Sequence, residues 1–69
     1  MSSLGEDLPK EQARVRALIL IYRGPLLNGA GEMAAVLMEQ DLRQTDIAVM
    51  SGDVVEMLRM YQKLKEWES

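Results

Sequence analysis

The sequence contains no cysteine and no histidine among its 69 residues. The absence of cysteine excludes disulfide bonds and thiolate metal ligands, and the absence of histidine removes the commonest metal ligand and general base. Aromatic residues are also scarce, at 4% of the chain, with no phenylalanine. Methionine and aliphatic side chains must therefore fill the core, and we expect the protein to need no cofactor and no metal ion.

Long hydrophobic runs are absent as well. The longest uninterrupted apolar runs, residues 17–22 and 33–38, are far shorter than the stretch of about 20 residues that crosses a bilayer. The amino-terminal sequence has neither the basic region nor the apolar region of a signal peptide. These features predict a cytoplasmic protein that does not enter a membrane.

Basic residues are too few and too scattered for a nucleic-acid-binding surface. The chain has a net charge of −3, and phosphate neutralisation supplies most of the affinity of proteins for nucleic acids. We therefore expect no nucleic-acid partner. Residues 24–53 hold one basic and five acidic residues. This acidic segment is either an ordinary solvated face or a surface that binds a basic partner.

Hydrophobic residues make up 48% of the chain and recur at helical spacing, and glycine and proline interrupt this pattern at two places. We predict an all-α fold with a single domain over residues 1–69 and helices at about 7–22, 31–50 and 54–67. Asp7 is the predicted N-cap of the first helix, with Pro9 in its first turn. Residues 1–6 are predicted to form a flexible segment.

The sequence SGD at residues 51–53 is the clearest turn signal in the chain. Gly52 suits the left-handed position that ends a helix, and Asp53 suits the N-cap of the next, with Glu56 completing a capping box. We therefore predict an antiparallel helical hairpin. Its predicted inward-facing residues are Ala35, Met38, Leu42, Thr45 and Val49 in the second helix and Val54, Met57, Leu58, Tyr61 and Leu64 in the third.

The second helix carries another stripe of residues across from its inward face. This stripe consists of Met33, Val36, Leu37, Gln40, Gln44 and Ile47. One neighbouring helix cannot cover both stripes, so either the third helix and the connector bury the second one or another copy of the chain does. Because so short a chain has few elements to spare, we predict that a homodimer completes the fold. Gln40 and Gln44 would then pair across the interface and set its register.

The acidic residues are not spaced as a catalytic or metal site would require. Arg43 stands between Glu39 and Asp46 on one helix face, which favours exposed ion pairs over acid/base chemistry. The glycine-rich connector, residues 24–31, lacks the lysine and the Ser/Thr of a phosphate-binding loop, so a plain turn is favoured over an anion site. We predict a protein that is not an enzyme.

The segments KEQARVRALILIY, GAGEMAAVLMEQ and DIAVMSGDVVEMLRMYQKLK resemble a set of small helical proteins of unknown function encoded in phages and prophages of proteobacteria. The resemblance covers roughly Lys10 to Lys65. Its most specific parts are LMEQ at residues 37–40 and SGDVVEML at residues 51–58. It implies a phage gene product in the cytoplasm of a bacterial host, and it carries over no activity and no binding residue.

Two functions are compatible with these features. The first is a self-associating interaction protein that binds a host or phage protein, with Arg16, Arg23, Met60 and Trp67 as candidate contact residues. The second is an anti-defence sponge, in which an oligomer seam with Arg14, Arg16 or Arg23 captures a small anionic nucleotide. A sponge needs several converging cations, and the small number of arginines therefore favours the interaction protein.

Overall fold

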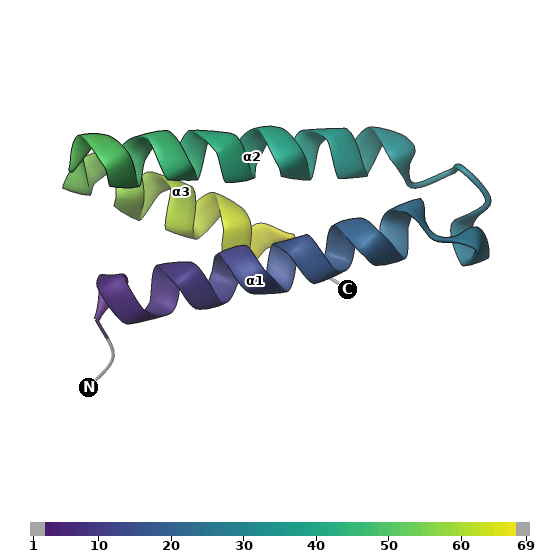
Figure 1. The fold of residues 1–69 in the computed structure, drawn as a ribbon, viewed down its shortest axis with the longest axis horizontal. Coiled ribbons are helices and arrows are strands. Elements are labelled where there is room, and N and C mark those ends of the chain that lie inside the picture. Colours follow the sequence, from purple (N-terminus) through teal and green to yellow (C-terminus); the bar gives the residue numbers. More distant parts are fainter. Residues whose placement is uncertain (1–2, 68–69) are drawn as a thin grey trace.

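The computed structural model describes residues 3–67, which form three α-helices and contain no strand. Helix α1 spans Leu4–Arg23, α2 spans Glu32–Ser51 and α3 spans Val54–Glu66, and a short 3-10 helix, η1, spans Pro25–Leu27. Helices α1 and α2 run antiparallel along the long axis of the molecule, and α3 folds back from the end of α2 to pack against both (Figure 1). The all-α, three-helix prediction is confirmed.

Helix α1 begins earlier than predicted. It starts at Leu4, so a flexible segment through residue 6 is wrong for the described residues, while residues 1–2 lie outside them. The carbonyl oxygen of Ser3 accepts hydrogen bonds from the backbone N–H groups of Glu6 and Asp7. Leu4 packs against the hydrophobic core, and this burial favours extending the helix past the predicted Asp7 cap.

The junction of α2 and α3 has the predicted geometry. Gly52 adopts a left-handed conformation with φ of 69°. Its N–H and that of Asp53 donate to carbonyls in the last turn of α2 at 3.2 and 3.1 Å, as in a Schellman motif. The Asp53 side chain accepts a hydrogen bond from the Glu56 N–H at 3.1 Å. In a full capping box the Glu56 carboxylate would accept a hydrogen bond from the Asp53 N–H. Here that N–H donates to the Ala48 carbonyl, and the Glu56 carboxylate binds Arg59.

The connector between α1 and α2 is shaped by a close approach at Gly31. A Cβ atom there would overlap the Tyr22 carbonyl oxygen and lie 2.9 Å from Leu27 Cδ1. Asn28 and Gly29 both adopt left-handed conformations, with φ of 49° and 86°. The connector therefore needs a glycine at position 31, where its backbone passes close to Tyr22 and Leu27. This agrees with its interpretation as a turn.

The core lies between the three helices and is mainly aliphatic. Its buried members are Leu8, Val15, Leu18, Ile19, Ala35, Met38, Leu42 and Leu64. The predicted inward stripe of α2 is correct except at Val49, which is 47% exposed while Ala48 is buried. Consecutive residues differ by about 100° around a helix. Because α3 packs beside α1, the buried side of α2 includes Ala48 and not Val49.

The predicted inward face of α3 is also rotated. Leu64 is buried as predicted, and Met57 and Tyr61 pack against the core, but Val54 and Leu58 are 59% and 50% exposed. Met60, which was not predicted to face inward, is completely buried. The rotation arises because α3 packs against α1 and α2 together, whereas the prediction considered only the hairpin partner α2.

Helix α3 is shorter than the pair that it packs against. It has 13 residues, and α1 and α2 have 20 each. At 1.5 Å per residue these lengths are about 20 and 30 Å. Helix α3 therefore lies over the end of the molecule that holds the α2–α3 turn and ends short of η1 (Figure 1). None of the described helices combines the length and the apolar character needed to cross a membrane.

Candidate functional site

The six residues predicted for self-association all lie on the solvent-facing side of α2, which we term the outer face. They are Met33 (74% exposed), Val36 (38%), Leu37 (44%), Ile47 (64%) and the exposed Gln40 and Gln44. Neither α3 nor the connector buries this stripe, so the alternative of burial within one chain is wrong. The outer face thus presents four apolar side chains and two amides, and the exposed Arg43, seven residues after Val36, lies at its edge.

The other predicted contact residues of α3 are less accessible. Met60 is completely buried, so its assignment as a partner contact is wrong, because the rotation of α3 turns it inward. Trp67 is half-buried and packs against the core. Its indole N–H also donates to the Asp41 carboxylate at 2.9 Å. Trp67 therefore has a clear structural role in joining α3 to α2.

The three arginines of α1 differ in their contacts and do not converge on one site. Arg23 forms ion pairs with Glu32, at 3.3 Å, and with Glu39. Hydrogen bonding to these carboxylates, mainly to Glu39, raises the pKa of Arg23 above its ordinary value. Arg14 binds α3, and Arg16 is exposed and makes no ion pair with a described residue. This arrangement of the described residues offers no convergent anion site and does not favour the nucleotide sponge.

A polar cluster that the sequence did not predict ties the end of α3 to both other helices. The Arg14 guanidinium donates to the backbone carbonyls of Trp67 and Leu64 at 2.7 and 2.8 Å. Lys63 Nζ lies 3.2 Å from the same Asp41 carboxylate that accepts the indole N–H. A cation is favourable at the carbonyl end of a helix, where the last turn lacks internal donors. Arg14 and Trp67 are 53 positions apart, so no local pattern indicated their contact.

The carboxylates of α2 make separate structural contacts. Glu39 binds Arg23, and Asp46 accepts a hydrogen bond from the Gln12 side chain at 2.9 Å. The predicted ladder through Arg43 is therefore not formed. Within residues 3–67, no group of three acidic, histidine or cysteine side chains could hold a metal ion. The observed pairs explain these carboxylates as links between α1 and α2.

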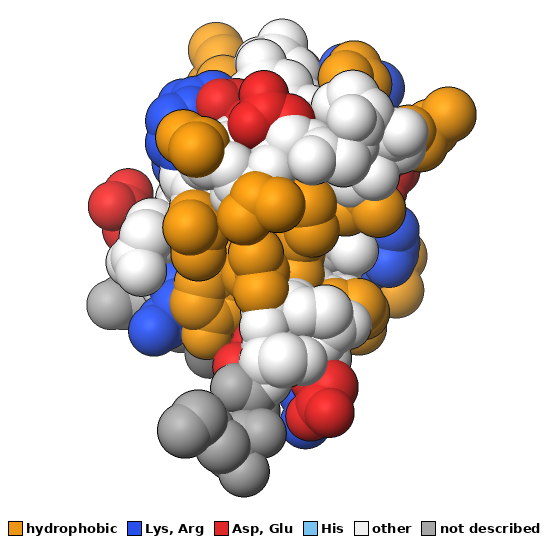
Figure 2. Space-filling model, turned by 90° about the vertical axis from the view of Figure 1, so that its left-hand side faces the viewer, with side chains coloured by type: hydrophobic (Ala, Val, Ile, Leu, Met, Phe, Trp, Pro, Cys, Tyr) orange, Lys and Arg blue, Asp and Glu red, His pale blue; other side chains and the backbone are white. Residues whose placement is uncertain are grey.

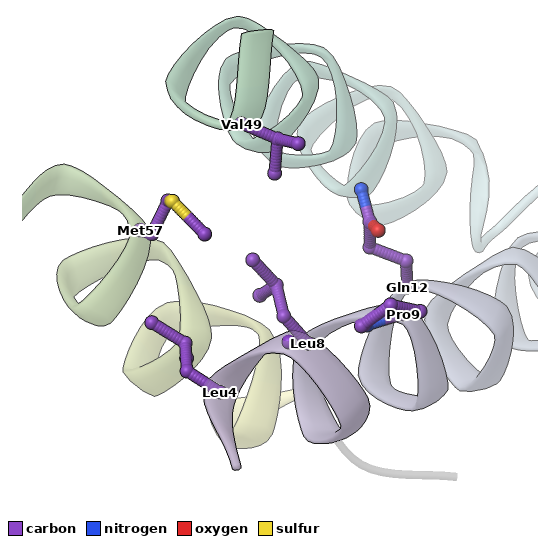
Figure 3. Close-up of a pocket in the computed structure, with 7 residues that line it drawn as sticks. Leu4, Leu8, Pro9, Gln12, Val49 and Met57 are labelled. Atoms are coloured by element: carbon purple, nitrogen blue, oxygen red, sulfur yellow. The ribbon is translucent and has the colours of Figure 1, made fainter. Parts of the chain in front are cut away.

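An apolar hollow lies at the end of the bundle where the start of α1 meets the α2–α3 turn; we term it the end hollow. Its volume is about 110 Å³, and its lining residues are Leu4, Gly5, Leu8, Pro9, Gln12, Val49 and Met57. Hydrophobic side chains gather in the middle of this face of the molecule (Figure 2). Leu8 projects from α1 between Val49 of α2 and Met57 of α3 (Figure 3). Leu8 is buried and Val49 is half-exposed, so the hollow opens to solvent beside α2.

No protein-family model, no curated protein and no solved structure matches this chain. The functional interpretation therefore depends on the surfaces of the molecule. The outer face of α2 and the end hollow are both apolar and accessible, and exposed apolar side chains also lie on α1 (Leu20, Ile21) and α3 (Val54, Val55, Leu58).

Proposed function

We propose that the protein is a non-catalytic helical interaction protein that forms a homodimer through the outer face of α2 and binds a second protein elsewhere on its surface. The exposure of four large apolar side chains along one side of α2 carries this proposal. Single exposed apolar residues are common in soluble proteins, but several of them gathered on one side of a helix favour an interaction site. The sequence resemblance supports a phage or prophage protein whose partner is a host or phage protein in the bacterial cytoplasm.

The outer face has a symmetry that suits a two-fold dimer. Met33 lies seven residues before Gln40, and Ile47 lies seven residues after it. In an antiparallel pairing with the two-fold axis at Gln40, Met33 of each copy packs against Ile47 of the other. The two Gln40 amides meet at the axis, where each can both donate and accept a hydrogen bond. A polar pair at the centre sets the register of an apolar contact.

Replacing Leu37 with glutamate tests this dimer. Leu37 is 44% exposed in the single chain, so Leu37→Glu leaves the fold in place. In the dimer it buries a carboxylate on both copies, which costs several kcal/mol. We expect light scattering to report about twice 7.8 kDa for the wild type and 7.8 kDa for the variant. The matched control, Val55→Glu, places the same charge on a side chain of α3 that is 77% exposed and should leave the dimer intact.

A wild type that scatters as a monomer throughout the micromolar range would contradict the dimer. A second measurement uses the absence of native cysteine. Gln40→Cys should form a disulfide-linked dimer on oxidation, because the two-fold axis brings the two positions within the roughly 4.4–6.8 Å Cα separation that a disulfide requires. Gln62→Cys, at an exposed position of α3, is the control and should not cross-link. Equal cross-linking of both variants would place the contact elsewhere.

A further inference from the structure

We propose that Met33 makes the dimer sensitive to oxidation: a peroxide converts its exposed thioether to a sulfoxide, and the sulfoxide weakens the contact between the two copies. This inference rests on the proposed dimer and assigns a form of regulation to the same surface. Met33 is the only methionine among the six residues of the outer face. In the antiparallel pairing it packs against Ile47 of the other copy.

The methionines of the chain differ in their access to a dissolved oxidant. Met33 and Met50 are 74% and 87% exposed, whereas Met38 and Met60 are completely buried. Met57 is half-buried and packs against the core. The chain has no cysteine, so no thiolate competes for the oxidant. We therefore expect Met33 and Met50 to react first among the methionines in residues 3–67.

The reaction transfers one oxygen atom and two electrons. A lone pair of the Met33 sulfur attacks one oxygen of hydrogen peroxide, and the O–O bond breaks. The departing hydroxide takes up the proton of the transferred OH group and leaves as water. The thioether is thereby oxidised to a sulfoxide and the peroxide is reduced to water. Methionine sulfoxide reductases reverse this change, so the modification can act as a switch.

Oxidation changes the chemical character of the outer face at Met33. A thioether is apolar and flexible, whereas a sulfoxide is polar. The Ile47 side chain of the other copy has no hydrogen-bond donor, so the sulfoxide loses water there without gaining a partner. The two-fold symmetry places one Met33 at each end of the contact. The Kd of the dimer should therefore rise roughly tenfold for one sulfoxide and roughly a hundredfold for two.

Met50 provides a control within the same helix. It lies 17 positions after Met33, so it is turned about 100° around α2 and is not one of the outer-face residues. Dimerisation should shield Met33 from peroxide and leave Met50 open to it. We expect the oxidation rate of Met33, relative to that of Met50, to fall as the protein concentration rises through the Kd of the dimer. Peptide mass spectrometry measures both sites in one sample, and a constant ratio would overturn the proposal.

Light scattering of protein treated with dilute hydrogen peroxide measures the effect on the dimer. At a protein concentration between the two Kd values, we expect about twice 7.8 kDa before treatment and 7.8 kDa after oxidation of Met33. Methionine sulfoxide reductases should restore the larger mass. Circular dichroism should show the same helix content before and after treatment, which distinguishes dissociation from unfolding.

A matched pair of variants identifies the methionine responsible. Met33→Leu removes the thioether from the outer face, so peroxide should leave the dimer Kd of this variant at its own starting value. Met50→Leu removes the other exposed thioether, and its dimer should remain as sensitive to peroxide as the wild type. Equal sensitivity of the two variants, or a wild type that stays dimeric with Met33 oxidised, would overturn this proposal alone. An untreated wild type that is already monomeric would instead overturn the dimer on which it rests.

Discussion

Replacing Trp67 with phenylalanine tests whether the polar cluster at the end of α3 stabilises the bundle. Trp67→Phe removes the indole N–H that donates to Asp41, whose side chain is only 11% exposed. It keeps the hydrogen bonds of Arg14, because these go to backbone carbonyls. Lys63 still pairs with Asp41, so the carboxylate is not left alone.

A hydrogen bond to a charged group contributes about 1.5–3 kcal/mol, and the retained Lys63 contact favours the lower part of this range. We expect a loss of about 2 kcal/mol for Trp67→Phe. For a domain of about 60–100 residues, each kcal/mol lowers Tm by about 4–8 °C, so the variant should melt about 8–16 °C below the wild type. Circular dichroism at one fixed protein concentration gives the measurement, because dimerisation makes Tm depend on concentration.

A double-mutant cycle with Asp41→Asn identifies the source of this loss. If the indole N–H and the carboxylate interact as the 2.9 Å distance indicates, the two substitutions are not additive and their coupling is about 1–2 kcal/mol. Additive losses, or a Tm for Trp67→Phe within a degree or two of the wild type, would refute this account of the cluster.

Three further predictions concern the turns and one ion pair. Gly52→Val should lower the free energy of unfolding by about 1–2 kcal/mol in urea titrations, because φ is 69° there and open space surrounds the position, so the cost is backbone strain alone. Gly31→Ala should destabilise more than Gly52→Ala in the same assay, because its Cβ overlaps the Tyr22 carbonyl oxygen; equal losses would contradict the close approach. Hydrogen bonding from Arg59 lowers the pKa of Glu56, so NMR titration should give a value below the ordinary one, and Arg59→Ala should restore it. The stability from this pair is present above the ordinary pKa of glutamate and is lost as the pH falls through the lowered pKa.

The surfaces differ in how far the sequence could predict them. The outer face of α2 follows from helical periodicity, because residues spaced three and four apart must share one side of a helix, and the structure leaves that side in solvent. The end hollow was not predicted. Its lining comes from the start of α1, the end of α2 and the start of α3, and the helix start at Leu4 that completes it was itself missed.

The sequence alone determined the features that depend on neighbouring residues. Gly52 and Asp53 form the predicted turn because a left-handed glycine and a side-chain cap are local requirements of the backbone. The three helices and their antiparallel hairpin follow from the same local chemistry together with apolar spacing.

Only the tertiary structure decided which side of each helix is buried. Periodicity shows that α3 has an apolar side, but Met60 rather than Leu58 is buried because α3 packs against two helices at once. The same packing buries Ala48 and leaves Val49 at the mouth of a hollow. Contacts such as that between Arg14 and Trp67 join residues 53 positions apart, and they exist only after the three helices have taken their places. The direction of neighbouring helices is a property of the whole fold, so no local pattern of residues contains it.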